Sequence, residues 1–105
     1  MSNVDTRLIA KPPTFSGRPA DWDGWRFHIT NYMGLVDDDY IDLLELAATR
    51  QNPIVMPVDA VVKQQSRTLF GILVSLFGSS AKCMALARSN MDRNGFELWR
   101  ALIAE

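Results

Sequence analysis

Apolar residues recur three and four positions apart in four separate windows of this sequence. That spacing places the apolar side chains on one side of an α-helix, where they can pack against a neighbouring helix. A half-buried strand would instead need apolar and polar residues in alternation, and no stretch of useful length shows this pattern. The sequence therefore predicts an all-α fold, a compact bundle of about five helices with an extended N-terminal segment packed on it.

Helix-breaking and capping residues set the expected boundaries. A pair of prolines predicts an extended segment over residues 8–15. We expect Ile9 and Phe15 to anchor this segment on the bundle, after a flexible N-terminus at residues 1–7. The expected helices run over residues 19–35, 40–49, 60–77, 79 or 80 to 88, and from 94 onward.

The apolar pattern also predicts how the helices pack. Residues 69–77 are apolar nearly all round, which predicts that they form the central, most buried helix. Gly24 lies inside a helix and is expected at a close contact. Asn94 and Glu97 resemble a capping box at the start of the last helix. The expected apolar faces consist of Trp22, Trp25, Ile29, Tyr32, Met33 and Val36 in the first helix, Ile41, Leu44 and Ala48 in the second, and Phe96, Trp99, Leu102 and Ile103 in the last.

The charge balance argues against a domain that binds nucleic acid by itself. Eleven Lys and Arg residues and twelve Asp and Glu residues give a net charge of −1, whereas binding through phosphates usually relies on a basic excess. The single Cys83 can form no internal disulfide, which favours a reducing, cytoplasmic location. The first ten residues lack a signal peptide, and the longest apolar run is far shorter than the about 20 residues that cross a membrane. No membrane association is expected.

No set of residues points to an enzyme, a cofactor or a metal ion, and none of these sites is expected. His28 is the only histidine and falls on a mostly exposed arc of the first helix. The aspartates at 37–39 could hold a cation, but carboxylates at a helix start explain them better. Lys82 could activate Cys83, but with no histidine nearby in sequence a buried structural cysteine is favoured. The aromatics around Trp22 could stack on bases, but core packing is favoured because few Lys and Arg residues interleave with them.

Phe15, Gly17, Trp22 and Trp25 form one motif near the start of the chain, and Trp99 and Leu102 form a second one near its end. In this combination the two motifs resemble Gag proteins of copia-like and gypsy-like retrotransposons. In that family a Phe-x-Gly turn precedes a Trp-bearing first helix, and a later helix ends in Trp-x-x-Leu. The same order and spacing occur here, and the likeness covers about residues 8–105. The residues that carry it are Phe15, Gly17, Trp22, Trp25, Trp99 and Leu102.

This resemblance implies the N-terminal lobe of a Gag capsid domain at residues 8–105. Such lobes are helical bundles that assemble side by side, as homo-oligomers held by weak interfaces, into a shell around the element's RNA. The helical pattern is still running at Glu105, so we expect a longer parent protein. In it, a second capsid lobe would follow, and a zinc knuckle or basic tail would bind the RNA; neither is present here. The sequence does not distinguish an active element from a host protein that adopted Gag.

The expected assembly surface lies on the first helix, away from its tryptophan face. It consists of Arg26, Phe27, Thr30 and Asn31. Phe27 either lies on the outside of the bundle or is covered by the segment at residues 8–15, and the sequence leaves both open.

Three other functions remain. The first is an adaptor that binds short peptides in a groove beside the extended segment, the second is a nucleic-acid-binding helical domain, and the last is an enzyme.

Overall fold

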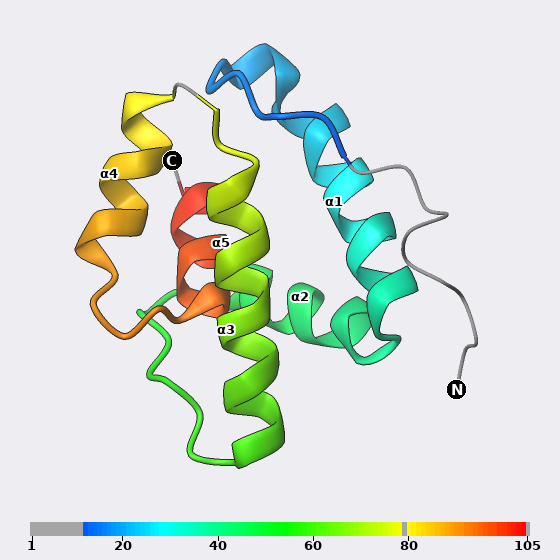
Figure 1. Cartoon of the computed structure of the whole chain (residues 1–105), viewed down its shortest axis with the longest axis vertical. Helices are drawn as coiled ribbons and strands as arrows, with labels where there is room; N and C mark the ends of the chain where they lie inside the picture. The colour runs from blue at the N-terminus through cyan, green and yellow to red at the C-terminus, as the bar shows by residue number, and fades with distance from the viewer. Residues whose placement is uncertain (1–11, 79, 105) are drawn as a thin grey trace.

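The fold is all-α. The computed structural model describes residues 12–78 and 80–104, and within these ranges it contains helices and no strand. In this part of the chain, a short 3-10 turn, η2, at Pro19–Asp21 precedes five α-helices, whose arrangement can be followed in Figure 1. The helices are α1 at Trp22–Val36, α2 at Asp39–Thr49, α3 at Ala60–Ser75, α4 at Ala81–Ser89 and α5 at Gly95–Ala104. The predicted bundle of about five helices is confirmed.

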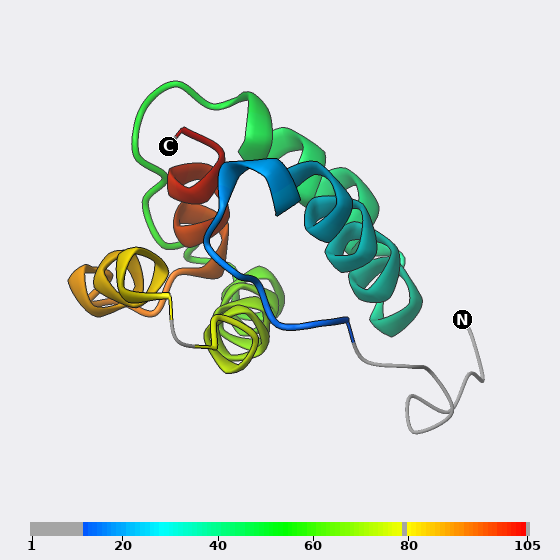
Figure 2. The ribbon, with the colours of Figure 1, turned by 90° about the horizontal axis from the view of Figure 1, so that it is seen from above.

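The helices divide the bundle into two sides. Helices α1 and α2 lie on one side and α4 lies on the opposite side, with α3 and α5 between them (Figure 1, Figure 2). Helix α5 is the centre of this arrangement, because it packs against α2, α3 and α4. Half of its residues are buried: Gly95, Phe96, Leu98, Trp99 and Leu102.

The prediction that residues 69–77 form the central helix is wrong. Helix α3 buries a single stripe, in which Leu69 and Leu73 are fully enclosed, while Phe70, Ile72 and Val74 stay partly exposed. The helix also ends at Ser75, two residues before the predicted end. The apolar side chains on all sides of residues 69–77 are therefore partly buried in several directions. The central position belongs to the shorter helix α5.

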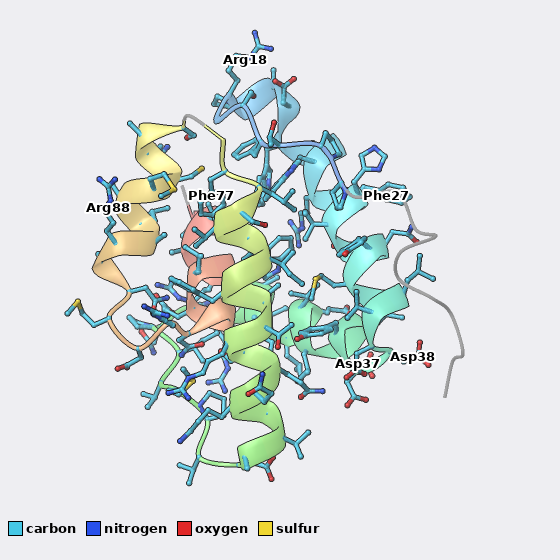
Figure 3. All side chains as sticks on the ribbon, in the orientation of Figure 1. Arg18, Phe27, Asp37, Asp38, Phe77 and Arg88 are labelled. Carbon is cyan, nitrogen blue, oxygen red and sulfur yellow. The ribbon has the colours of Figure 1, made fainter. Side chains whose placement is uncertain are left out.

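The extended segment before η2 packs on the bundle as predicted. The Phe15 N–H donates to the Leu76 carbonyl over 2.7 Å, and the Trp25 indole N–H donates to the Pro13 carbonyl, also over 2.7 Å. Phe77 is fully buried just beyond α3 and points into the bundle (Figure 3). Phe15 therefore anchors the segment, as predicted. The second predicted anchor, Ile9, and the flexible N-terminus expected at residues 1–7 lie outside the described residues.

The buried face of α2 differs from the predicted one. Tyr40, Leu44 and Ala47 are buried, while Ile41 is 52% exposed. The reason is a hydrogen bond in which the Tyr40 hydroxyl donates to the Gln65 carbonyl over 2.6 Å. Burial, together with the negative charge of a nearby aspartate, raises the pKa of Tyr40 to about 12. A tyrosine that reaches a buried acceptor on α3 thus sets the rotation of α2, which the apolar spacing alone misses.

Two helices approach each other tightly at Gly95, whereas Gly24 lies at no such contact. A Cβ added at Gly95 would overlap the Ser66 carbonyl oxygen and lie 2.6 Å from the Phe70 nitrogen, both of them backbone atoms of α3. A Cβ at Gly24 would meet nothing within 4 Å. The expectation for Gly24 is therefore wrong, and the glycine at the start of α5 is the one that lets two helices touch.

The predicted capping box is half correct. The Asn94 Oδ1 accepts from the Glu97 N–H over 3.2 Å, as a cap should. The Glu97 carboxylate, however, accepts from the Ile54 N–H over 2.7 Å and pairs with Arg100 over 2.7 Å, so it holds the loop between α2 and α3. Burial opposes ionisation of Glu97, but the hydrogen bonds from Arg100 and Ile54 outweigh it, and its pKa lies below the usual value. The start of α5 therefore serves as the junction between this loop and the core.

Candidate assembly surface

The groups considered for chemistry are dispersed or already engaged. His28 is exposed on α1 and lies with its ring 6.0 Å from that of Phe27. Cys83 is buried, as the structural interpretation expected. Within residues 12–78 and 80–104, no three His, Cys, Asp or Glu side chains are grouped so as to hold a metal ion. In the same part of the chain, no helix is both long enough and apolar enough to cross a membrane.

The aspartates at 37–39 mark the start of α2. The Asp37 Oδ1 accepts from the Asp39 N–H over 2.9 Å. The Gln65 amide donates to Asp37 over 3.2 Å and to Asp39 over 3.0 Å. These bonds place the carboxylates at a helix N-terminus and tie it to α3, in keeping with the structural interpretation of the acidic run.

The residues that carry the resemblance meet in one place. Phe15 stacks on Trp25 with ring centroids 4.7 Å apart and meets Trp22 edge-on at 5.6 Å. Trp22 lies 5.8 Å from Trp99, which comes from the other end of the chain. We call Phe15, Trp22, Trp25 and Trp99 the aromatic cluster.

Gly17 and Leu102 complete this arrangement. Gly17 has a φ of +85°, and a Cβ there would lie 2.6 Å from the Ser80 Oγ, so the turn requires glycine. Together with Phe15 and Trp22, Gly17 and Leu102 line a small cavity of about 130 Å³. All six motif residues therefore belong to one structural unit, whose role is to hold the extended segment against α1 and α5.

A groove lies between α1 and α2. Its volume is about 470 Å³. The buried Trp99 forms its floor, because it lines the groove although it is only 1% exposed. We call this the α1–α2 groove; its walls include Asp23, Arg26, Phe27, Thr30, Ile41 and Glu45.

Three of the four predicted assembly residues line this groove. Arg26, Phe27 and Thr30 belong to it, whereas Asn31 is exposed but lies outside the lining. Phe27 is 70% exposed on the outer side of α1, away from α3 (Figure 3). Residues 12–15 therefore do not cover Phe27. The remaining residues of the segment, 8–11, lie outside the described part of the chain.

The sequence missed the α2 wall of the groove. The apolar spacing places Ile41 on the predicted core face of α2, and no feature of the sequence marks Glu45. Gly34 permits the arrangement, because a Cβ at that position would lie 3.0 Å from the Ile41 Cγ1. Burial of Tyr40 would have indicated this wall, because it rotates α2 so that Ile41 and Glu45 face the same outer side.

The groove has a polar as well as an apolar character. The Arg26 guanidinium lies over the Trp99 ring, 6.0 Å from its centroid. Asp23 and Glu45 are exposed carboxylates on either wall. Among the described residues, neither of them forms a salt bridge or a side-chain hydrogen bond. The groove thus offers apolar contact area flanked by charges that are free to pair with an incoming group.

No protein-family model, curated protein or solved structure matches this chain. The likeness to Gag therefore rests on the motif residues themselves.

Proposed function

We propose that this chain is a non-enzymatic assembly module, a Gag-like capsid N-lobe that associates with copies of itself through weak protein–protein contacts. The observation that carries the proposal is the exposed Phe27 beside Ile41 in the α1–α2 groove. Neither side chain is needed in that position for folding, because the core lies on the other faces of both helices. Large apolar side chains gathered at a surface hollow are typical of interaction sites.

The arrangement of the motif residues supports the family proposal. Residues 15–25 and 99–102 are more than 70 positions apart in the sequence, and they pack into one cluster. A motif whose two parts touch has a reason to keep its order and spacing. The packing of the two parts therefore supports the proposal of a Gag-like capsid lobe, which would belong to a shell around retroelement RNA.

The size of the groove favours a weak contact. Stable complexes bury about 1,600 Å² in total, and a groove of about 470 Å³ can contribute only part of such an area. The loss of rotational and translational freedom then leaves a dissociation constant on the order of 0.1–1 mM. Weak contacts suit a shell, because misplaced subunits can leave and because several contacts act together once a lattice forms.

Sedimentation velocity of the chain from about 10 µM to about 1 mM tests the proposal. We expect the average mass to rise with concentration, and we expect the rise to be lost in the double variant Arg26→Ala/Phe27→Ser. His28→Ala is the matched control, because it removes a neighbouring exposed ring that does not line the groove. A chain that stays monomeric throughout this range would contradict self-assembly.

RNA binding provides a second check on the division of roles. With a net charge of −1, the chain offers little neutralisation of phosphates. We therefore propose that RNA is contacted by other segments of the parent protein, and we expect the isolated chain to bind RNA weakly and without sequence preference. Submicromolar binding at physiological salt, measured by fluorescence anisotropy, would contradict this.

The second candidate function is a peptide-binding adaptor. The groove favours it because two helices form an open channel with an aromatic floor, which fits an amphipathic helix or an extended segment. The two functions separate in one comparison. An adaptor stays monomeric at about 1 mM yet binds apolar peptides with amide shifts at Phe27 and Ile41, whereas an assembly module self-associates.

A further inference from the structure

The near-zero net charge conceals a strong separation of charge along the chain. Residues 12–50 contain three arginines and seven Asp or Glu residues, a net charge of −4. Residues 51–104 contain six Lys or Arg residues and three Asp or Glu residues, a net charge of +3. The first set includes α1 and α2, and the second includes α3, α4 and α5.

The fold places parts of these two sets on opposite sides of the bundle. The pair α1–α2 lies on one side of the bundle, and α4 with the loop that follows it lies on the other (Figure 1, Figure 2). Figure 3 shows Asp37 and Asp38 at the turn between α1 and α2, and Arg88 on the outer side of α4. The α1–α2 side therefore carries an acidic excess, and the side formed by α4 and the loop after it carries a basic excess, so copies would attract one another in a head-to-tail orientation.

A second hollow lies on the basic side. Its volume is about 710 Å³, and we call it the α3–loop hollow. Its lining includes Lys63, Arg67 and Phe70 from α3, and Met91, Asp92 and Arg93 from the loop between α4 and α5. Met91 is 88% exposed and stands at this site as an apolar projection among basic side chains. Within residues 12–78 and 80–104, the side chains of Lys63, Arg67 and Arg93 form no salt bridge.

The two surfaces carry complementary charges. The α1–α2 groove is a channel with Phe27 and Ile41 on its walls and two unpaired carboxylates, Asp23 and Glu45. The α3–loop hollow offers a projecting methionine and three unpaired cations. Even the minority charges match, since Arg26 belongs to the groove and Asp92 to the hollow.

Resting on the proposed self-assembly, we propose that the occupant of the α1–α2 groove is the α3–loop hollow of a second copy of this chain. Met91 of one copy packs against Phe27 and Ile41 of the next, and Arg67 and Arg93 lie near Asp23 and Glu45. Because the contact pairs two different surfaces of the same chain, it is heterologous. Each added copy leaves one groove and one hollow free, so the interaction propagates into a ring or a filament instead of stopping at a dimer.

Charge reversal tests this pairing. The groove variant Asp23→Lys/Glu45→Lys and the hollow variant Arg67→Glu/Arg93→Glu each place like charges at the contact, and each should weaken self-association by at least about tenfold. All four side chains are exposed, and circular dichroism melting checks that both variants remain folded. If either pair fails to fold, the single variants Glu45→Lys and Arg93→Glu repeat the test.

The decisive step is to mix the two variants. Reversed groove then faces reversed hollow, and native groove faces native hollow, so sedimentation velocity of the equimolar mixture should recover the average mass of the unmodified chain. Arg50→Glu/Arg88→Glu is the matched control, because it makes the same change in net charge outside both surfaces. It should associate about as well as the unmodified chain does, because neither substituted side chain lines the groove or the hollow.

The outcomes separate this inference from the function on which it rests. If the unmodified chain associates but the reversals have no effect, or if the mixture stays monomeric, the pairing of groove and hollow is wrong while self-assembly stands. A loss confined to the groove variant would likewise overturn the pairing, because it indicates a contact between two grooves. A monomeric unmodified chain at all concentrations would instead overturn the proposed function.

Discussion

The two sides of α1 make opposite use of aromatic residues. Trp25 is buried, stacks on Phe15 and donates its indole N–H to the Pro13 carbonyl. Phe27, two positions later, is 70% exposed and points away from the core. The fold explains the aromatic side chain of Trp25, because that ring packs in the core, but it gives no reason for the aromatic side chain of Phe27. Stability and association should therefore be separable in this protein, although both depend on the same helix.

The largest expected effect comes from the aromatic cluster. Trp99→Ala and Trp25→Ala should each lower the free energy of unfolding by about 3–5 kcal/mol, because each removes a large buried ring. That loss is close to the whole stability of a small domain. Urea denaturation followed by circular dichroism measures it. A variant that melts within a few degrees of the unmodified protein would mean that the cluster does not support the fold.

A matched pair of glycines gives the next effect, with opposite signs. Gly95→Ala should lower the free energy of unfolding by about 1–3 kcal/mol, because its methyl group would overlap the backbone of α3. Gly24→Ala should raise it by about 0.4–1 kcal/mol, because an exposed helix interior gains from alanine. Thermal melting of both variants measures the contrast. Equal effects at the two positions would show that α3 and α5 are further apart than described.

The raised pKa of Tyr40, on the buried face of α2, predicts that the stability of the protein depends on pH. Burial and the nearby Asp37 raise its pKa in the folded protein to about 12, above the ordinary value of 10.0. The folded state therefore holds this proton more tightly than the unfolded state does. The stabilisation is complete below pH 10 and is lost as the pH rises toward 12.

Unfolding measured across this alkaline range should show the loss in the unmodified protein and a flatter profile in Tyr40→Phe. The variant is also expected to be less stable at neutral pH by about 1 kcal/mol, because the Gln65 carbonyl loses its donor. An identical alkaline slope in both proteins would assign the pH dependence to other groups.

The smallest effect on stability is expected at the groove. Phe27→Ala and Ile41→Ser should each change the free energy of unfolding by no more than about 0.5 kcal/mol, because both side chains are largely exposed. Both should nevertheless reduce self-association, which analytical ultracentrifugation measures on the same samples. A large loss of stability at either residue would contradict the separation of the two sides of α1.

The sequence predicted those features that depend on local periodicity. The tryptophan face of α1 follows from apolar residues three and four positions apart, and Trp25, Ile29 and Met33 are buried as expected. The start of α3 follows from Asp59, whose side chain accepts from the N–H groups of two residues in the first turn. Such signals lie within one helix and need no knowledge of its neighbours.

The errors arose where one helix depends on another. The rotation of α2 is set by a bond from Tyr40 to α3, and the central place of α5 is set by the absence of a side chain at Gly95. For the same reason the sequence placed Phe27 on the assembly surface but missed Ile41, which faces it across the groove. The separation of charge between the two sides also requires the fold, because the net charge alone conceals it.

An NMR dilution series of the ¹⁵N-labelled chain tests the central claim most directly. Between about 1 mM and about 20 µM, we expect the backbone amide signals of Phe27, Thr30 and Ile41 to shift with concentration. Those of Phe15 and Trp25 in the aromatic cluster should stay fixed, because the inner side of α1 takes no part in association. Shifts centred on the cluster with none in the groove, or no concentration dependence at any residue, would contradict the account.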